Sequence, residues 1–195
     1  MNIRVISIAI LAGIAGSVVY WSIKEKPQSK PVSVISVEAK PDQYFSYREI
    51  NKGENPLRPI FSMPDRYNKI RNITEWDGKV ILLNFWATWC PPCRKEMPAF
   101  IQLQKKYASQ GFQVIGVALD KMSKVNIFAD KIGVNYPLLV GALNAAEISR
   151  AYGNAGGQLP YTVFINRQGK LVAAKLGEIS KQQAEKIIKQ LLKVK

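Results

Sequence analysis

The feature that most constrains the fold is a pair of cysteines between two segments of different pattern. Val80–Trp86 is apolar apart from one asparagine, as a central strand buried on both faces requires. Cys93–Gln110 instead carries apolar side chains at helical spacing, and Gly111 ends that pattern. The sequence Trp89-Cys90-Pro91-Pro92-Cys93 joins the two segments. We therefore expect a buried strand that continues into a helix through a turn holding both cysteines.

The remainder of the chain alternates between strand and helix patterns, with no internal repeat. Further strands are predicted at Phe112–Leu119, Tyr136–Val140, Tyr161–Asn166 and Lys170–Leu176, the last two as a hairpin. Two further helices are predicted with Ser123 and Asn144 as their N-terminal caps, and a last helix is predicted over about Ser180–Lys193. A short hairpin is expected within Pro59–Ile73. This order predicts an α/β fold with a central mixed sheet and helices on both faces.

The N-terminus has the features of a membrane anchor. Val5–Ile23 is uncharged over 23 − 5 + 1 = 19 residues, close to the roughly 20 that a helix needs to cross a bilayer. Tyr20 and Trp21 lie near its end, where aromatic side chains favour the membrane interface. We expect an uncleaved signal anchor, and a cleaved signal peptide is the alternative.

The domain organisation follows from this reading. Residues 1–23 are expected to be the transmembrane signal anchor, and residues 24–58 a tether and N-terminal extension. Residues 59–195 are expected to form one folded domain. The secretion-like start places that domain outside the cytoplasm, although the positive charges on the two sides of the anchor do not fix its orientation.

The charge balance narrows the choice of partners. The formal charge is +14, from 28 basic and 14 acidic side chains. The lysines are scattered, and basic and aromatic residues do not interleave, so we expect no nucleic-acid partner. A solvated basic surface explains the charge, and attraction to acidic partners or anionic lipid headgroups is the functional alternative.

Cys90 and Cys93 are the only cysteines, and the chain has no histidine. Zinc sites take three or four protein ligands from Cys, His, Asp and Glu, so we expect no metal here. A purely structural disulfide in so short a loop would contribute roughly 2 kcal/mol in the chain-entropy model. A redox-active dithiol is the better interpretation, and it needs no cofactor.

The predicted helix start gives the two cysteines different roles. Cys90 is expected to be the N-cap, with Pro91 and Pro92 in the first turn, where proline is tolerated. Free N–H groups and the helix dipole then stabilise a Cys90 thiolate. Cys90 is therefore expected to be the exposed attacking sulfur, and Cys93 the more buried resolving thiol.

Three segments resemble those of the TlpA/ResA/DsbE group of thioredoxin-like proteins. They are Asn84–Cys93, Glu96-Met97-Pro98 and Gln158–Asn166. The resemblance implies a thioredoxin-like fold with extra strand and helix material at about Lys121–Val140. It also implies a membrane-anchored, extracytoplasmic thiol–disulfide oxidoreductase.

The resemblance extends to individual residues around the cysteines. It implies that the Leu159–Pro160 bond is cis and that both residues line the site and contact the partner. It matches Glu96 with a family glutamate and Asn84 with a family asparagine, and it sets Trp89 beside the sulfurs.

Helix spacing independently turns Glu96 inward. Glu96 falls three residues after Cys93, on nearly the same face of the predicted helix. Burial there would raise its pKa and allow it to exchange protons with the thiols. A surface glutamate paired with a lysine is the alternative.

The expected function is therefore reduction of protein disulfides, with apocytochrome c as a candidate substrate. The resemblance implies that electrons come from a membrane thiol carrier of the DsbD/CcdA type. A general disulfide oxidant or isomerase is the alternative. A thiol peroxidase fits less well, because that chemistry favours threonine where Ala87 stands. A redox-inert binding module fits poorly with an intact Cys-x-x-Cys pair.

Overall fold

The computed structural model describes residues 48–49 and 55–194. The expected anchor and most of the expected tether lie outside these residues. The main element is one mixed sheet in the order β1-β8-β7-β4-β5-β6. Its strands are β1 (Arg48–Glu49), β4 (Val80–Trp86), β5 (Phe112–Ala118), β6 (Leu138–Val140), β7 (Tyr161–Ile165) and β8 (Leu171–Leu176). The pairs β4/β5 and β5/β6 are parallel, whereas β4/β7, β7/β8 and β1/β8 are antiparallel. The predicted mixed sheet is confirmed.

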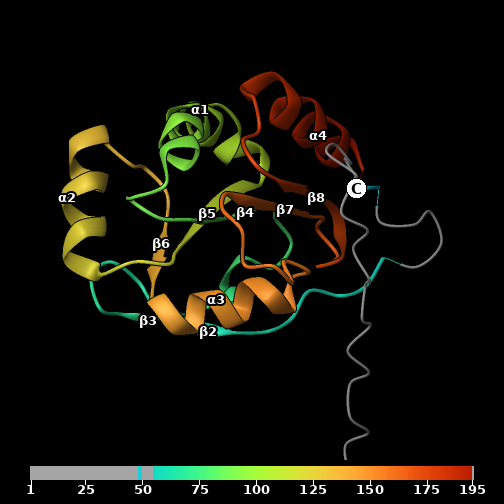
Figure 1. Cartoon of the computed structure of the whole chain (residues 1–195). Coiled ribbons are helices and arrows are strands. Elements are labelled where there is room, and N and C mark those ends of the chain that lie inside the picture. Colours follow the sequence, from blue (N-terminus) through green and yellow to red (C-terminus); the bar gives the residue numbers. More distant parts are fainter. Residues whose placement is uncertain (1–47, 50–54, 195) are drawn as a thin grey trace, which may run out of the picture. The chain divides into compact units, whose positions relative to one another are not determined.

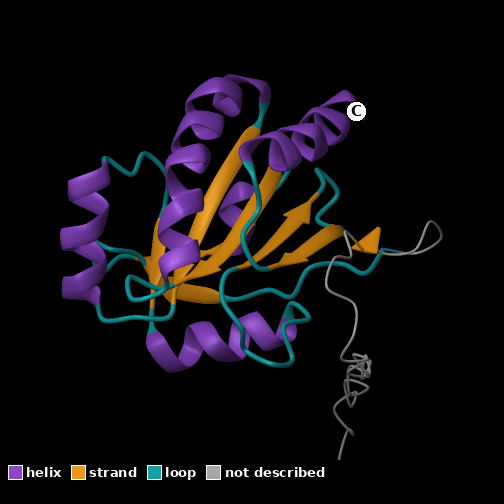
Figure 2. Ribbon diagram, turned by 45° about the horizontal axis from the view of Figure 1, so that its top comes forward, coloured by secondary structure: helices purple, strands orange, loops and turns teal. Residues whose placement is uncertain are grey.

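Helices cover both faces of the sheet, as predicted (Figures 1 and 2). The helices are α1 (Pro91–Tyr107), α2 (Met122–Ile132), α3 (Ala142–Ala151) and α4 (Lys181–Lys193). Side chains of α1, α2 and α4 share one apolar cluster with Leu82, Trp86 and Val114 of the central strands. Side chains of α3 share a second cluster with Leu83 and Phe85. Because strand side chains alternate between faces, every residue of β4 is buried in one layer or the other.

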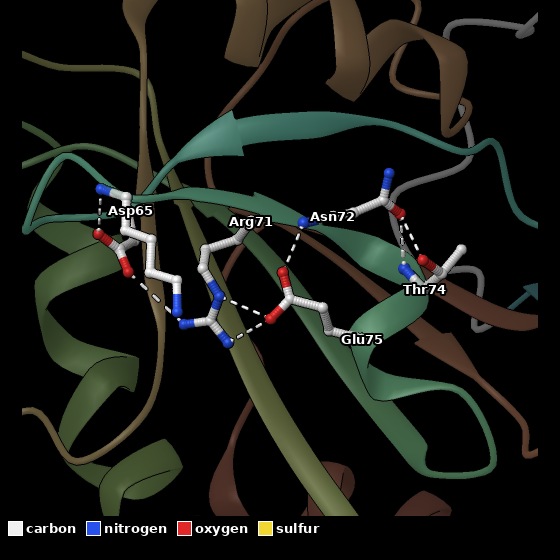
Figure 3. A network of polar contacts seen from close by, with 6 residues as sticks. Asp65, Arg71, Asn72, Thr74 and Glu75 are labelled. Carbon is white, nitrogen blue, oxygen red and sulfur yellow. Dashed lines mark hydrogen bonds and ion pairs between the residues drawn. The ribbon is translucent and has the colours of Figure 1, made fainter.

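A hairpin of β2 (Ser62–Pro64) and β3 (Ile70–Asn72) lies between β1 and β4 in the chain and continues into a short 3-10 helix, η1 (Ile73–Trp76). Polar contacts fix this corner (Figure 3). Arg71 pairs with Glu75 at 2.7 Å and with Asp65 at 3.5 Å. Glu75 also accepts the N–H of Asn72, whose side chain in turn accepts the N–H of Thr74. The pairing of β2 with β3 confirms the predicted hairpin, and the capping box formed by Asn72 and Glu75 begins η1.

Two predicted helix caps are wrong. The α2 helix begins after Lys121 and the α3 helix after Gly141, so Ser123 and Asn144 lie inside the first turns. Both helices start one or two residues before the predicted cap, with three residues between β5 and α2 and one residue between β6 and α3. The predicted span of the last helix is confirmed by α4, and the Ser180 hydroxyl caps it by accepting the N–H of Gln183 at 3.2 Å.

The edge strand β1 is an addition that the sequence did not indicate. Arg48 and Glu49 pair with Ala174 and Ala173 of β8. Leu57 bridges to Lys170 at the start of the same strand. The sheet thus uses residues that precede position 59, where we expected the domain to begin. Among the residues that the structure describes, none of the helices is long and apolar enough to span a bilayer.

Candidate active site

The two cysteines lie where the sequence predicted, at the carboxyl end of β4. Cys90 is the N-cap of α1 and forms a disulfide with Cys93. The N–H of Cys93 donates to Cys90 Sγ at 3.3 Å. Pro91 and Pro92 occupy the first helical turn, where their missing N–H groups leave no bond unmade. Cys90 is 4% exposed and Cys93 is fully buried, so the expectation that Cys90 is exposed is wrong, although Cys93 is the more buried of the two, as expected.

Strand register brings the Leu159–Pro160 segment to the same end of the sheet. Tyr161, the first residue of β7, pairs with Phe85 near the end of β4. Pro160 therefore adjoins the strand end from which the turn to Cys90 departs. The Leu159–Pro160 peptide bond is cis, as the resemblance implied. Pro160 is buried, and the half-buried Leu159 packs against the apolar clusters of both faces.

Glu96 points into the protein, as the helix spacing predicted. It is 2% exposed, and each of its oxygens accepts one hydrogen bond. The side-chain amide of Asn84 donates to Oε1 at 2.7 Å. The backbone N–H of Ile179 donates to Oε2 at 3.1 Å. Asn84 also donates to the hydroxyl of the buried Thr162 at 3.0 Å. The alternative of a lysine-paired surface glutamate is wrong.

Burial controls the electrostatics of Glu96. Burial removes solvent from this carboxyl and raises its pKa to about 8. The hydrogen bonds from Ile179 and Asn84 act in the opposite direction and lower the pKa, but burial is the larger effect. Both bonds come from neutral donors. The nearby Glu178 raises the pKa further, and Lys175 lowers it. A carboxyl with a pKa near 8 changes its protonation in the same pH range as ordinary thiols.

Trp89 lies beside Cys90 in the chain but on the outside of the protein. Its side chain is 63% exposed, in contrast to Trp86, which is fully buried. A large exposed aromatic next to a reactive pair suits contact with another chain. Within the described residues, no group of three or more His, Cys, Asp or Glu side chains gathers where it could hold a metal ion.

Sequence reasoning missed Asp120, which follows β5. Its Oδ2 accepts both the N–H of Thr88, at 3.0 Å, and the Thr88 hydroxyl. Thr88 belongs to the turn between β4 and Cys90, so Asp120 joins the site through it. The sequence did contain a signal for Asp120, which is an acidic residue directly after a predicted buried strand. Because the parallel neighbours β4 and β5 end at the same edge of the sheet, a residue after β5 lies close to the turn after β4.

Comparisons with known proteins agree with this geometry. Residues 57–174 match the AhpC/TSA family. The chain is 31% identical over 192 residues to the thiol-disulfide oxidoreductase ResA of Bacillus anthracis, covering 96% of this chain and 94% of that protein. The chain belongs to the ResA-like group of the thioredoxin superfamily.

Two further ResA-like or thioredoxin-like proteins are similar over most of their length. The thioredoxin-like protein YneN of Bacillus subtilis is 32% identical over 149 residues, which is 73% of this chain and 83% of YneN. The crystal structure of a thiol:disulfide interchange protein from Chlorobium tepidum is 30% identical, with a TM-score of 0.66. The match covers 73% of this chain and 99% of the Chlorobium tepidum chain. The thioredoxin-like fold is thereby confirmed.

The ResA-like family and the Cys90–Cys93 pair together define the activity. The protein is a thiol–disulfide oxidoreductase that acts on protein disulfides. Its redox centre is supplied by two side chains at the start of one helix.

Proposed function

We propose that this ResA-like protein is tethered to the cytoplasmic membrane and reduces protein disulfides on the extracytoplasmic side. The observation that carries the proposal is the redox pair at the start of α1 with a buried carboxyl, Glu96, one turn further on. The uncharged segment Val5–Ile23 supports the tether. The reducing direction is what the resemblance to the TlpA/ResA/DsbE group implies.

In the proposed reaction the Cys90 thiolate attacks one sulfur of the partner's disulfide. The partner's S–S bond breaks, a Cys90–partner bond forms, and the released partner sulfur takes up a proton. Cys93 then loses its proton and attacks Cys90, which forms the Cys90–Cys93 disulfide and frees the second partner thiol. The partner gains two electrons from the two cysteines. One of its two protons balances the proton that Cys93 gives up, and the other comes from solvent, because Cys90 reacts as a thiolate that has already lost its own.

Glu96 supports the second step in this proposal. With a pKa of about 8 the carboxyl is partly ionised near neutral pH, and its ionised form accepts a proton from Cys93 when that thiol becomes the nucleophile. It returns the proton when the pair is reduced again. Because both hydrogen bonds to Glu96 come from neutral groups, the carboxyl is held in place in either protonation state.

The proposed electron donor is a membrane thiol carrier of the DsbD/CcdA type, and the proposed substrate is an apocytochrome c before haem attachment. Trapping tests both. Replacing Cys93→Ala removes the resolving sulfur, so a mixed disulfide at Cys90 accumulates and can be identified by mass spectrometry. Recovery of an apocytochrome supports the maturation role, whereas many unrelated exported proteins would indicate a general reductant or isomerase. The double variant Cys90→Ser with Cys93→Ala should capture nothing.

Membrane attachment is tested separately. The full chain should sediment with membranes, and a chain lacking residues 1–23 should not. A membrane-impermeant thiol reagent should label reduced Cys90 in intact spheroplasts. Labelling only after lysis would contradict the extracytoplasmic placement.

A thiol peroxidase is distinguished by one assay. The buried Ala87 stands where that chemistry favours threonine, and the hydroxyl of the next residue, Thr88, is held by Asp120. The purified domain should therefore consume hydrogen peroxide no faster than a simple dithiol does. Rapid turnover would overturn the proposal in favour of a peroxidase.

A further inference from the structure

Asp120 connects two segments that flank the redox pair. One of its oxygens accepts the N–H of Thr88 at 3.0 Å together with the Thr88 hydroxyl. The other oxygen accepts the N–H of Lys121, at the start of α2, at 2.7 Å. The residue is only 8% exposed. A buried carboxylate thus ties the turn after β4 to the turn after β5.

The turn held by Asp120 is the one that orients Cys90. It runs from Ala87 to Cys90 and is closed by a bond from the N–H of Cys90 to the carbonyl of Ala87 at 3.2 Å. Within this turn Ala87 is fully buried and Trp89 is exposed. Thr88 lies between them, and its backbone N–H is bound by the side chain of Asp120. Because Cys90 is the N-cap of α1, the position of its sulfur depends on this turn.

The charge on Asp120 also matters at this place. Burial acts to raise the pKa of the carboxyl, but the bonds from Thr88 and Lys121 outweigh it and hold the pKa below its usual value. Asp120 is therefore ionised at neutral pH. A fixed negative charge disfavours a nearby thiolate, and a less stable reduced form makes a dithiol pair more reducing.

We propose that Asp120 is a positioning residue for the thiol–disulfide reaction, which holds the turn before Cys90 through Thr88 and biases the pair toward the disulfide by its charge. The inference rests on the proposed role of Cys90 as the attacking sulfur. Other charged or titratable side chains on the elements around the site are those of Arg94, Lys95, Glu96, Lys121, Lys124, Tyr136, Lys175 and Glu178, which the test below leaves unchanged.

The first test removes the charge. Asp120→Asn keeps one carbonyl oxygen that can accept from Thr88 and gives up the bond from the N–H of Lys121, which lies on the side away from the turn before Cys90. We expect its equilibrium constant with the glutathione couple to shift about threefold toward the dithiol, or about 14 mV. The matched control is Asp130→Asn, which removes a carboxylate from the last turn of α2 that is 70% exposed and paired with Arg66. A shift no larger than that of the control would overturn the role of the charge.

The second test isolates the positioning. Thr88→Val keeps the charge of Asp120 but removes the hydroxyl bond, so exchange with a protein disulfide should slow about threefold while the glutathione equilibrium stays unchanged. Thr88→Ser restores the hydroxyl and should restore the rate. A wild-type rate in Thr88→Val would overturn the positioning role. Failure of the proposed function has a different signature, because exchange would then survive in Cys90→Ser.

Discussion

The two ends of β4 are held by different chemistry. At the amino end, Arg58 pairs with Asp77, and Arg167 donates to the carbonyls of Gly78 and Gln110, both at 2.9 Å. Charged guanidinium groups thus fasten the loops that precede β4 and β5. At the carboxyl end, two carboxyl groups, those of Glu96 and Asp120, accept hydrogen bonds from amide, hydroxyl and backbone donors.

The difference shows why only one end can carry the chemistry. At the amino end the contacts come from guanidinium groups, one on the carboxylate of Asp77 and one on two backbone carbonyls. At the carboxyl end Asp120 stays ionised, whereas the deeply buried Glu96 has a pKa near 8, so its charge changes close to neutral pH. The amino end therefore stabilises the fold, and the carboxyl end is suited to proton and thiol chemistry.

The largest effect should follow from Cys90→Ser. Loss of the attacking sulfur should lower the rate of disulfide exchange roughly 10⁴-fold or more, as removal of an enzyme's nucleophile does. Insulin reduction with dithiothreitol as the donor measures the rate. Arg167→Met, at the other end of β4, is the matched control and should retain the wild-type rate per folded molecule. A Cys90→Ser variant within tenfold of wild type would contradict the assignment.

Glu96→Gln should change how stability depends on pH. The native state holds the Glu96 proton up to about pH 8, whereas an unfolded chain releases it near 4.5. Stability from this group is thus present below about 4.5 and is lost as the pH rises toward 8. Each pKa unit corresponds to about 1.4 kcal/mol, so the total loss is a few kcal/mol.

Urea unfolding at pH 5, 7 and 9 measures this loss. The Gln side chain does not titrate, so the difference in unfolding free energy between variant and wild type should shift in favour of the variant as the pH rises. A difference that is constant with pH would show that Glu96 is charged throughout. Insulin reduction at pH 7 should also slow, by on the order of 10²-fold, if Glu96 handles the proton.

Arg58→Ala tests the amino end. Arg58 is largely buried, with an exposed partner in Asp77, so its loss removes packing and one charge-assisted bond. We expect about 2 kcal/mol of destabilisation by chemical unfolding. Exchange per folded molecule should stay at the wild-type value. A slower exchange at unchanged stability would show that the two ends are coupled.

Trp89→Ala should have the smallest effect on the protein itself. The side chain is 63% exposed, so the free energy of unfolding should change by less than about 0.5 kcal/mol. The KM for a protein disulfide should rise several-fold, and exchange with a small aromatic disulfide reagent should change less than twofold. Equal losses with both substrates would mean that Trp89 acts on the cysteines and not on the partner.

The sequence predicted the elements better than their contacts. The bounds of β4 match the predicted strand residue for residue, because a continuous apolar run between a glycine turn and a cysteine motif leaves little choice. The β1 strand was not predicted, since a strand of two residues is too short to leave a periodic pattern. The caps at Ser123 and Asn144 failed because local preference was overridden by where β5 and β6 end.

The sequence predicted the features of the site that lie within one element, but not the contacts between elements. Glu96 could be turned inward from helix spacing alone, but its bond from the backbone of Ile179 joins residues 83 positions apart and involves no side chain of Ile179. Asp120 and Thr88 are 32 positions apart and meet only because β4 and β5 are parallel neighbours. Contacts of this kind require the topology, which the spacing of motifs does not supply.

The bond from Ile179 to Glu96 makes a backbone amide a spectroscopic reporter on the site. The amide proton of Ile179 points directly at Oε2, at an N···O distance of 3.1 Å. Its NMR resonance should move downfield when the carboxyl ionises, because a charged acceptor polarises the N–H bond more strongly. A single ¹⁵N-labelled isoleucine signal could then follow the proton on Glu96 through each redox state, with no probe attached to either cysteine.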